Sequence, residues 1–217
     1  MKYLLTALIL LCSSLSICSA ADSVKVELSA ETLLLHYSSA TAETFKGREA
    51  IHLKNTPAHP NGPVALIKGV AIENAIIEVD IASERFAGIA FRSQDGDHYE
   101  KVYFRPFNSG TDKHLNSVQY AVMGNTSLGW NPLRKQFPGT FESGADVPVM
   151  EWFRAKLVID GGKVEVFVND GAEPVLVIDQ TLSGYTGGGV GIWGWNAYFA
   201  NFEYTPLPKS KPLGGRD

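Results

Sequence analysis

Short apolar segments that alternate with polar residues recur along the chain after residue 22. In residues 77–81 the apolar side chains occupy the odd positions and the charged Glu78 and Asp80 lie between them, the period-two pattern of a strand with one buried face. No window of eleven or more residues keeps the apolar spacing of a helix. The pattern predicts about a dozen short strands, at 24–28, 33–37, 51–53, 64–67, 75–81, 86–92, 99–104, 117–123, 154–159, 164–168, 175–178, 189–193 and 198–204.

Turn residues and polar segments separate these strands. Asp160-Gly161-Gly162 lies between two of them and predicts a hairpin, because glycine accepts the positive φ angles of tight turns. Residues 107–116 and 124–148 are expected to be loops, and the second is long enough to suggest a function. We therefore expect one all-β domain over residues 21–206, a two-sheet antiparallel jelly-roll sandwich, followed by a disordered tail at 207–217.

The first twenty residues have the organisation of a secretory signal peptide. Met1-Lys2 is followed by an apolar core from Leu4 to Cys12, and small residues precede Ala21. This core is nine residues long, whereas a membrane-spanning helix needs about 20. The sequence thus predicts cleavage after Ala20, export to the periplasm or the extracellular space, and no transmembrane segment in the mature chain.

Both cysteines, Cys12 and Cys18, lie inside this segment, so the mature chain is expected to have no disulfide and no cysteine ligand for a metal. Residues 15–18 loosely resemble a lipoprotein cleavage box that would lipidate Cys18. Ile17 is too bulky for the position before such a cysteine, which argues against lipidation.

Composition and charge narrow the possible partners. Hydrophobic residues make up 45% of the chain and charged residues 19%, which is typical of a globular protein. The formal net charge is −4, so the chain as a whole lacks the net positive charge typical of proteins that bind nucleic acid, and no nucleic-acid partner is expected. The five histidines have no spacing typical of zinc sites, and no cofactor is expected except for one possible calcium ion.

Several segments resemble the concanavalin A-like lectin/glucanase superfamily. Within it, the chain is most similar to exported bacterial domains related to laminin-G modules and to 3-keto-disaccharide hydrolase-like domains. The resemblance covers roughly residues 24 to 205 and implies two antiparallel sheets, with a site on the concave face of one of them. The segments that carry it are FKGREAI at 45–51, IEVDI at 77–81, AGIAFR at 87–92, YEKVYFRP at 99–106, SVQY at 117–120, WFRAKL at 152–157, VEVFVN at 164–169 and GVGIW at 189–193.

The same alternation sorts the outward side chains of the strands. In residues 99–105, Val102 and Phe104 are expected to face the core. This leaves the opposite face to Tyr99, Lys101, Tyr103 and Arg105. Aromatic rings stack on sugar rings, while arginine and glutamine bind sugar hydroxyls, so an oligo- or polysaccharide is the expected partner. The candidate ligand-binding residues are Arg92, Tyr103, Arg105 and Gln119 for hydrogen bonds, Trp193 and Trp195 for stacking, and Trp130 from the long loop.

The sequence is also compatible with other functions. Glu78 and Asp80, or Glu100, are candidates for the carboxylates of a glycoside hydrolase. Glu84 comes too late in the sequence to complete the three-carboxylate strand of laminarinase-type enzymes. A polysaccharide lyase or a laminin-G-like protein-interaction module are further alternatives. Asp95 and Asp97, which lie in a turn, are the candidates for holding a structural calcium ion.

Overall fold

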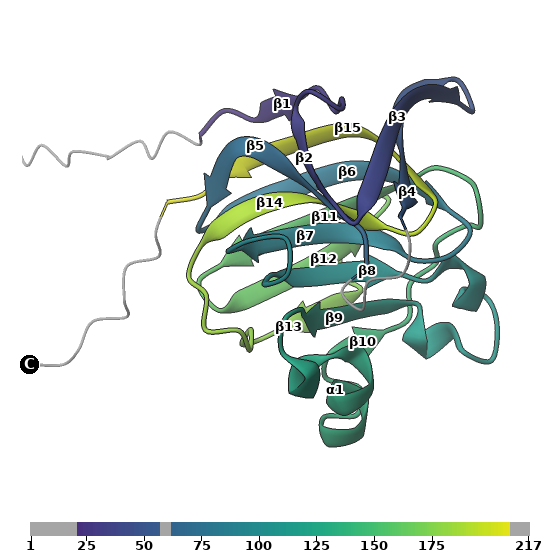
Figure 1. The fold of residues 1–217 in the computed structure, drawn as a ribbon. Coiled ribbons are helices and arrows are strands. Elements are labelled where there is room, and N and C mark those ends of the chain that lie inside the picture. The colour runs from purple at the N-terminus through teal and green to yellow at the C-terminus, as the bar shows by residue number, and fades with distance from the viewer. Residues whose placement is uncertain (1–20, 57–61, 209–217) are drawn as a thin grey trace, which may run out of the picture.

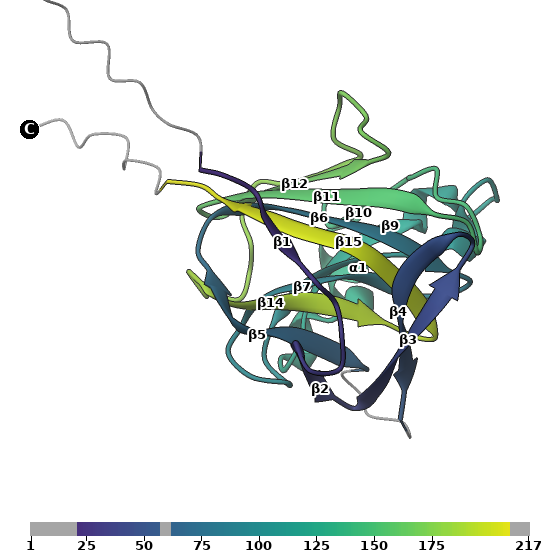
Figure 2. The same ribbon diagram turned by 90° about the horizontal axis from the view of Figure 1, so that it is seen from above.

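The computed structural model describes residues 21–56 and 62–208, which form two antiparallel sheets packed face to face (Figures 1 and 2). The predicted signal peptide with Cys12 and Cys18, and residues 209–217 of the predicted tail, lie outside the described residues. The expected two-sheet antiparallel sandwich is confirmed.

One sheet has eight strands in the order β13-β12-β11-β6-β15-β4-β3, with β1 also paired to β15. The other has seven strands in the order β10-β9-β8-β7-β14-β5-β2. The eight-stranded sheet consists of β1 (Val24–Val26), β3 (Ser38–Phe45), β4 (Arg48–Asn55), β6 (Ala75–Ser83), β11 (Phe153–Asp160), β12 (Lys163–Val168), β13 (Leu176–Ile178) and β15 (Ala197–Pro206). The seven-stranded sheet consists of β2 (Leu33–His36), β5 (Val64–Ile72), β7 (Ala87–Ser93), β8 (Glu100–Phe104), β9 (Val118–Val122), β10 (Glu142–Ser143) and β14 (Gly188–Gly194).

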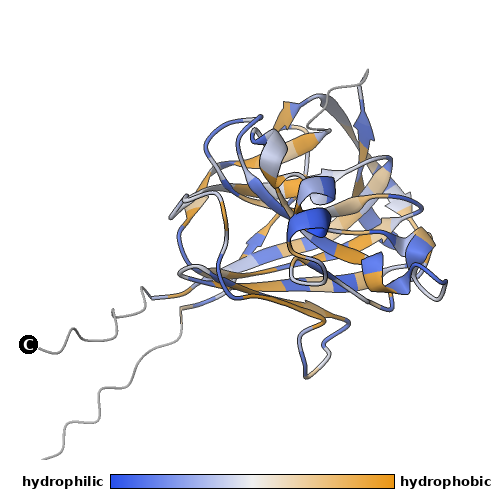
Figure 3. Cartoon of the chain, turned by 90° about the horizontal axis from the view of Figure 1, so that it is seen from below, coloured by the Kyte–Doolittle hydropathy of each residue, from blue (hydrophilic) through white to orange (hydrophobic). Residues whose placement is uncertain are grey.

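The main core lies between the two sheets and follows from the alternation in the sequence (Figure 3). In β11 every second residue from Phe153 to Ile159 is buried, while Arg154 and Lys156 point away from the core. A second apolar cluster lies on the outer face of the seven-stranded sheet and consists of Val64, Leu66, Ala90, Tyr99, Tyr103, Ala121 and Trp193. The seven-stranded sheet is therefore covered on both faces, which is why β7, β8 and β9 are buried along their whole length.

Two parts of the chain differ from the sequence-based expectation. Strand β3 was not predicted, because its sequence SSATAETF is mostly polar; it pairs with β4 through a tight turn in which Lys46 and Gly47 both have positive φ. The long segment expected to be a loop contains the 3₁₀ turn η3 (Thr126–Leu128), the helix α1 (Trp130–Gln136) and β10. α1 has only seven residues, too few to show a helical period, and its Leu133 is fully buried.

Segment 107–116 is likewise expected to be a loop, and two 3₁₀ turns frame it, η1 (Pro106–Asn108) and η2 (His114–Asn116). At the C-terminus, β15 ends at Pro206, and the backbone N–H of Leu207 still donates a hydrogen bond to the carbonyl of Asn74. Among the helices of the described residues, none is long and apolar enough to cross a membrane.

Candidate functional site

A groove of about 940 Å³ runs over the outer face of the seven-stranded sheet. β8 forms part of its floor, and Trp193 and Trp195 from the end of β14, together with the segment containing α1, form its sides. Its aromatic lining consists of Phe86, Tyr103, Phe107, Trp130, Trp193 and Trp195. Its charged lining, within the described residues, consists of Lys101, Arg105, Lys113 and Arg134.

Small residues on the neighbouring strands make room for the long side chains of β8. Lys101 lies between Ala90 of β7 and Ala121 of β9, and Tyr103 lies opposite Gly88. A Cβ atom at Gly88 would come within 2.9 Å of the Cβ of Tyr103, so glycine is required for this close approach. The alternation along β8 thus places Lys101, Tyr103 and Arg105 on the groove face, as predicted.

Arg105 is the centre of a hydrogen-bond network at one end of the groove. Its guanidinium donates to the Tyr103 hydroxyl at 2.6 Å, to the Asn116 carbonyl at 2.9 Å and to the Gln119 side-chain oxygen. Gln119 in turn donates from Nε2 to the Trp130 carbonyl at 3.1 Å. Gln119 is fully buried and does not line the groove, so it positions Arg105 and Trp130. Burial raises the pKa of Tyr103 to about 12, so its hydroxyl stays protonated at neutral pH.

The predicted tryptophans reach the groove with different exposure. Trp130 is 47% exposed and Trp195 is 36% exposed, whereas Trp193 is only 4% exposed. The ring of Trp193 is covered by the amine of Lys101, whose Nζ lies 3.4 Å from the ring centroid. Trp130 and Trp195 therefore offer ring faces to a ligand, and Trp193 chiefly holds Lys101.

The sequence places Lys101 on the groove face, but neither Lys101 nor Arg134 was among the predicted ligand-binding residues. Arg134 of α1 binds Glu142 of β10 through Nε, at 2.7 Å to Oε1, and lies 5.1 Å from the Trp130 ring centroid. This pair fixes α1 and Trp130 against the sheet, since Glu142 is buried. A signal existed for Lys101, because it shares the alternating face of Tyr103 and Arg105, but nothing in the sequence distinguishes a buried lysine from an exposed one.

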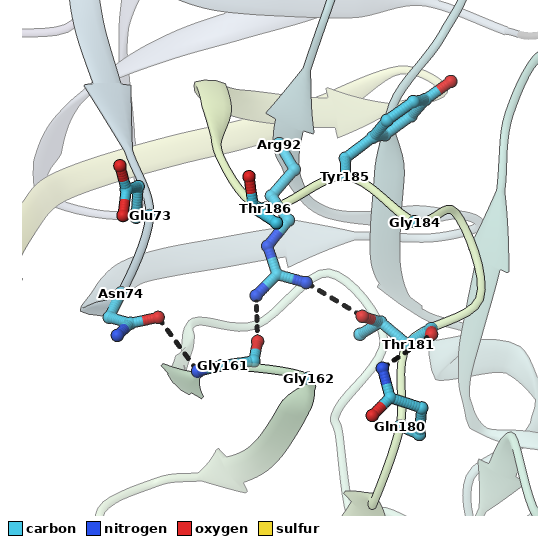
Figure 4. Close-up of a pocket in the computed structure, with 10 residues that line it drawn as sticks. All are labelled: Glu73, Asn74, Arg92, Gly161, Gly162, Gln180, Thr181, Gly184, Tyr185 and Thr186. Carbon is cyan, nitrogen blue, oxygen red and sulfur yellow. Dashed lines mark hydrogen bonds between the residues drawn. The ribbon is translucent and has the colours of Figure 1, made fainter. Parts of the chain in front are cut away.

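Arg92, one of the predicted ligand-binding residues, does not lie on the groove face. Arg92 has a positive φ of 49°, and β14 has a register shift opposite it between Gly189 and Gly191, so the bulge turns this side chain toward the other sheet. There its guanidinium donates to the Gly161 carbonyl and to the Thr181 hydroxyl, beside a second cavity of about 350 Å³ (Figure 4). The buried Nε of Arg92 has no hydrogen-bond partner among the described residues.

Glu100, the third carboxylate candidate, also points into the sandwich. It is fully buried and accepts hydrogen bonds from the Ser183 hydroxyl and, at 3.4 Å, from Arg92. Burial raises its pKa. Glu100 therefore connects β8 to the segment around Ser183 and does not reach the groove.

The candidate pair Glu78 and Asp80 lies on the outer face of the eight-stranded sheet, on the side of the molecule away from the groove. Both carboxylates face Arg154, whose Nε is 3.5 Å from Glu78 and whose Nη1 is 3.3 Å from Asp80. Asp80 is also paired with Arg48 and accepts a hydrogen bond from Asn201. The structure thus does not bring these carboxylates together with the predicted ligand-binding residues.

The turn with Asp95 and Asp97 is organised by its own hydrogen bonds. The Asp95 carboxylate accepts from the backbone N–H groups of Asp97 at 2.7 Å and of His98 at 2.8 Å, while Asp97 accepts from the Tyr37 hydroxyl at 3.1 Å. Calcium takes six to eight oxygen ligands. No cluster of three or more metal-ligating side chains occurs in the described part of the chain.

Comparisons with known proteins agree with this architecture. No model of a known protein family matches the sequence, and no curated protein matches it. Among solved structures, the carbohydrate-binding module CBM66 from Bacillus subtilis superposes with a TM-score of 0.54 at 13% identity, covering 86% of this chain and 96% of that one. The shared fold is a two-sheet antiparallel jelly roll.

Two further solved structures share this fold. A Bacillus subtilis protein of unknown function with a galectin-like fold gives a TM-score of 0.53 at 10% identity, covering 83% of this chain and 91% of that one. The exoplasmic/lumenal domain of VIP36, in a form with bound Ca²⁺ and Man3GlcNAc, gives a TM-score of 0.53 at 14% identity, with coverage of 84% and 88%. At these identities the likeness establishes the jelly-roll sandwich.

Proposed function

We propose that this chain is an exported glycan-binding domain whose ligand lies in the groove over the seven-stranded sheet. The observation that carries the proposal is the combination of exposed Trp130 and Trp195 rings with the fixed guanidinium of Arg105 in one groove. Apolar faces of sugar rings stack on indole rings, and a planar guanidinium donates to ring hydroxyls. The shared fold supports this proposal. CBM66 is a carbohydrate-binding module, and the VIP36 domain has a mannose-containing glycan bound.

The groove favours binding over glycoside hydrolysis. Hydrolysis uses two carboxyl groups on opposite sides of the glycosidic bond. No described residue that lines the groove is an aspartate or a glutamate, and the adjacent Glu142 is bound by Arg134. Retention of a polysaccharide without release of reducing ends is therefore the expected behaviour.

Replacing either exposed tryptophan should weaken retention. We expect Trp130→Ala and Trp195→Ala each to lower the affinity for a retained glycan about tenfold, because stacking on an exposed ring contributes about 1–2 kcal/mol. Binding is measured by glycan array and by isothermal titration with the best ligand. Trp152→Ala is the matched control, since Trp152 lies against Phe45 on the other sheet. Equal loss in all three variants, or no retention by the unaltered protein, would contradict the proposal.

Export is proposed from residues 1–20 and is tested separately. After expression in a bacterial host, the processed protein should begin at Ala21, as read by N-terminal sequencing of the periplasmic or culture fraction. Recovery of the chain in the cytoplasm with Met1 and Lys2 still attached would refute the signal peptide without affecting the groove.

A further inference from the structure

The charged residues that line the groove in the described part of the chain are all cationic. Lys101, Arg105, Lys113 and Arg134 line it, and no described lining residue carries a negative charge. Arg134 is neutralised by Glu142, which leaves the other three without a carboxylate partner among the described residues. The whole chain has a net charge of −4, so this concentration of positive charge is local to the groove.

Lys101 is the most unusual of these cations. Only 5% of the residue is exposed, and its amine forms no hydrogen bond with any described residue. Its contacts are the Trp193 ring at 3.4 Å and the Tyr103 ring at 4.9 Å. Aromatic faces compensate only part of the lost hydration of an ammonium group, and buried ammonium groups are normally paired.

We propose that the ligand of the groove is an acidic glycan, whose carboxylate or sulfate group binds at the amine of Lys101. This inference rests on the proposed glycan-binding function and adds the chemical class of the ligand. Lys101 is followed two residues later by Tyr103 and four residues later by Arg105 on the same face of the sheet, so an anion beside Lys101 also lies in the field of the Arg105 guanidinium. An acidic group would give the buried amine the partner that the protein itself does not provide.

The proposed binding of an anion at Lys101 predicts a pH dependence of the affinity. Burial, followed by the charge of Arg105, lowers the pKa of Lys101 well below its ordinary value. An anion favours the protonated amine, so the affinity for an acidic glycan should fall as pH rises through this lowered pKa. The other titratable groups on this face are Tyr99, Tyr103 and Arg105, and burial raises the pKa of both tyrosines, so they stay protonated between pH 6 and about 9. The facing residues Ala90, Ala121 and Trp193 do not titrate.

The experiment compares polymers that differ only in charge. Polygalacturonate is compared with its methyl-esterified form, and dextran sulfate with dextran, by titration at fixed ionic strength. We expect the unaltered protein to bind one acidic polymer at least about tenfold more tightly than its neutral counterpart. The reason is that a hydrogen bond between charged groups contributes more free energy than one between neutral groups. The first pair tests a uronate and the second a sulfate ester. Poly-glutamate is the control for attraction to any polyanion.

Lys101→Met separates ligand binding from a structural role. This variant should lose the preference for the acidic polymer, and its urea unfolding midpoint should rise, because a buried cation that opposes folding has been removed. Lys156→Met is the matched control, since Lys156 stacks on Phe167 at 4.4 Å on the other sheet. It should leave the preference unchanged.

Three results would overturn the proposal. These are equal affinity for acidic and neutral polymers, a preference that survives in Lys101→Met, and binding of poly-glutamate as tight as that of the acidic glycan. In the first two cases a retained neutral glycan would leave the proposed function intact. Failure to retain any glycan would refute the proposed function together with this inference.

Discussion

Glu100→Ala is expected to lower the free energy of unfolding by about 3–5 kcal/mol. The side chains of Arg92 and Glu100 are 2% and 0% exposed, with Nη1 and Oε2 3.4 Å apart. Removing the carboxylate leaves a buried guanidinium without its countercharge and leaves the Ser183 hydroxyl without its acceptor. Urea denaturation followed by tryptophan fluorescence measures the change.

An exposed ion pair provides the control for this prediction. Lys163 and Glu165 lie 2.6 Å apart at the surface, with side chains 48% and 29% exposed. Glu165→Ala should change stability by less than about 1 kcal/mol, because exposed pairs contribute little. If Glu100→Ala also lowers the free energy of unfolding by less than about 1 kcal/mol, the contacts of Glu100 with Arg92 and Ser183 do not determine stability.

The stability contribution of Glu100 should also depend on pH. Because burial raises its pKa in the folded state, the folded protein binds this proton more tightly than the unfolded chain does. The free energy of unfolding therefore falls as pH rises from the ordinary range of a glutamate through the raised pKa. In Glu100→Gln this part of the pH dependence should be missing, and an identical pH profile in the two proteins would argue against the buried, ionisable Glu100.

Arg105→Met is expected to weaken glycan binding about 100-fold, or ~2.7 kcal/mol. Arg105 is 5% exposed and is held by Tyr103, Gln119 and Asn116, so it presents its guanidinium to the groove in one orientation. Arg105→Lys should recover only a small part of the loss, since an ammonium group cannot reproduce a planar fork of donors. Affinity is measured by titration with the glycan that the unaltered protein retains.

The control for Arg105 is an arginine that is held by ion pairs outside the groove. Arg154 of β11 is bound to Asp80 and Glu203 on the other sheet, so Arg154→Met is expected to affect stability without changing affinity. Thermal unfolding of each variant ensures that binding is compared between folded proteins. An affinity of Arg105→Met within about threefold of the unaltered protein would remove Arg105 from the binding site.

Much of the fold and part of the site follow from local patterns. The period-two alternation in β8 correctly separates Val102 and Phe104, which face the core, from Tyr103 and Arg105, which face the groove. The same alternation in β11 identifies the core residues from Phe153 to Ile159. Pleating forces successive side chains to opposite faces, so this information is present within a few residues of sequence.

Alternation fails where a single residue breaks the pleat. Arg92 has a positive φ beside a β-bulge, and this one residue moves its side chain from the groove face into the space between the sheets. Arginine rarely adopts a positive φ angle, so nothing in the sequence indicates this conformation. The partners of Arg92 and Glu100, namely Gly161, Thr181 and Ser183, are distant along the chain.

The sequence by itself determines that this protein is a two-sheet antiparallel sandwich, and which side of β8 carries the binding candidates, because strand period and turn residues are local properties. Only the tertiary structure decides that α1 and Trp130 fold over that face, that Glu78 and Asp80 lie on the other sheet, and that Lys101 is buried on Trp193 without a hydrogen-bond partner among the described residues. These features depend on contacts between segments far apart in sequence, and burial of a polar group is set by what packs over it.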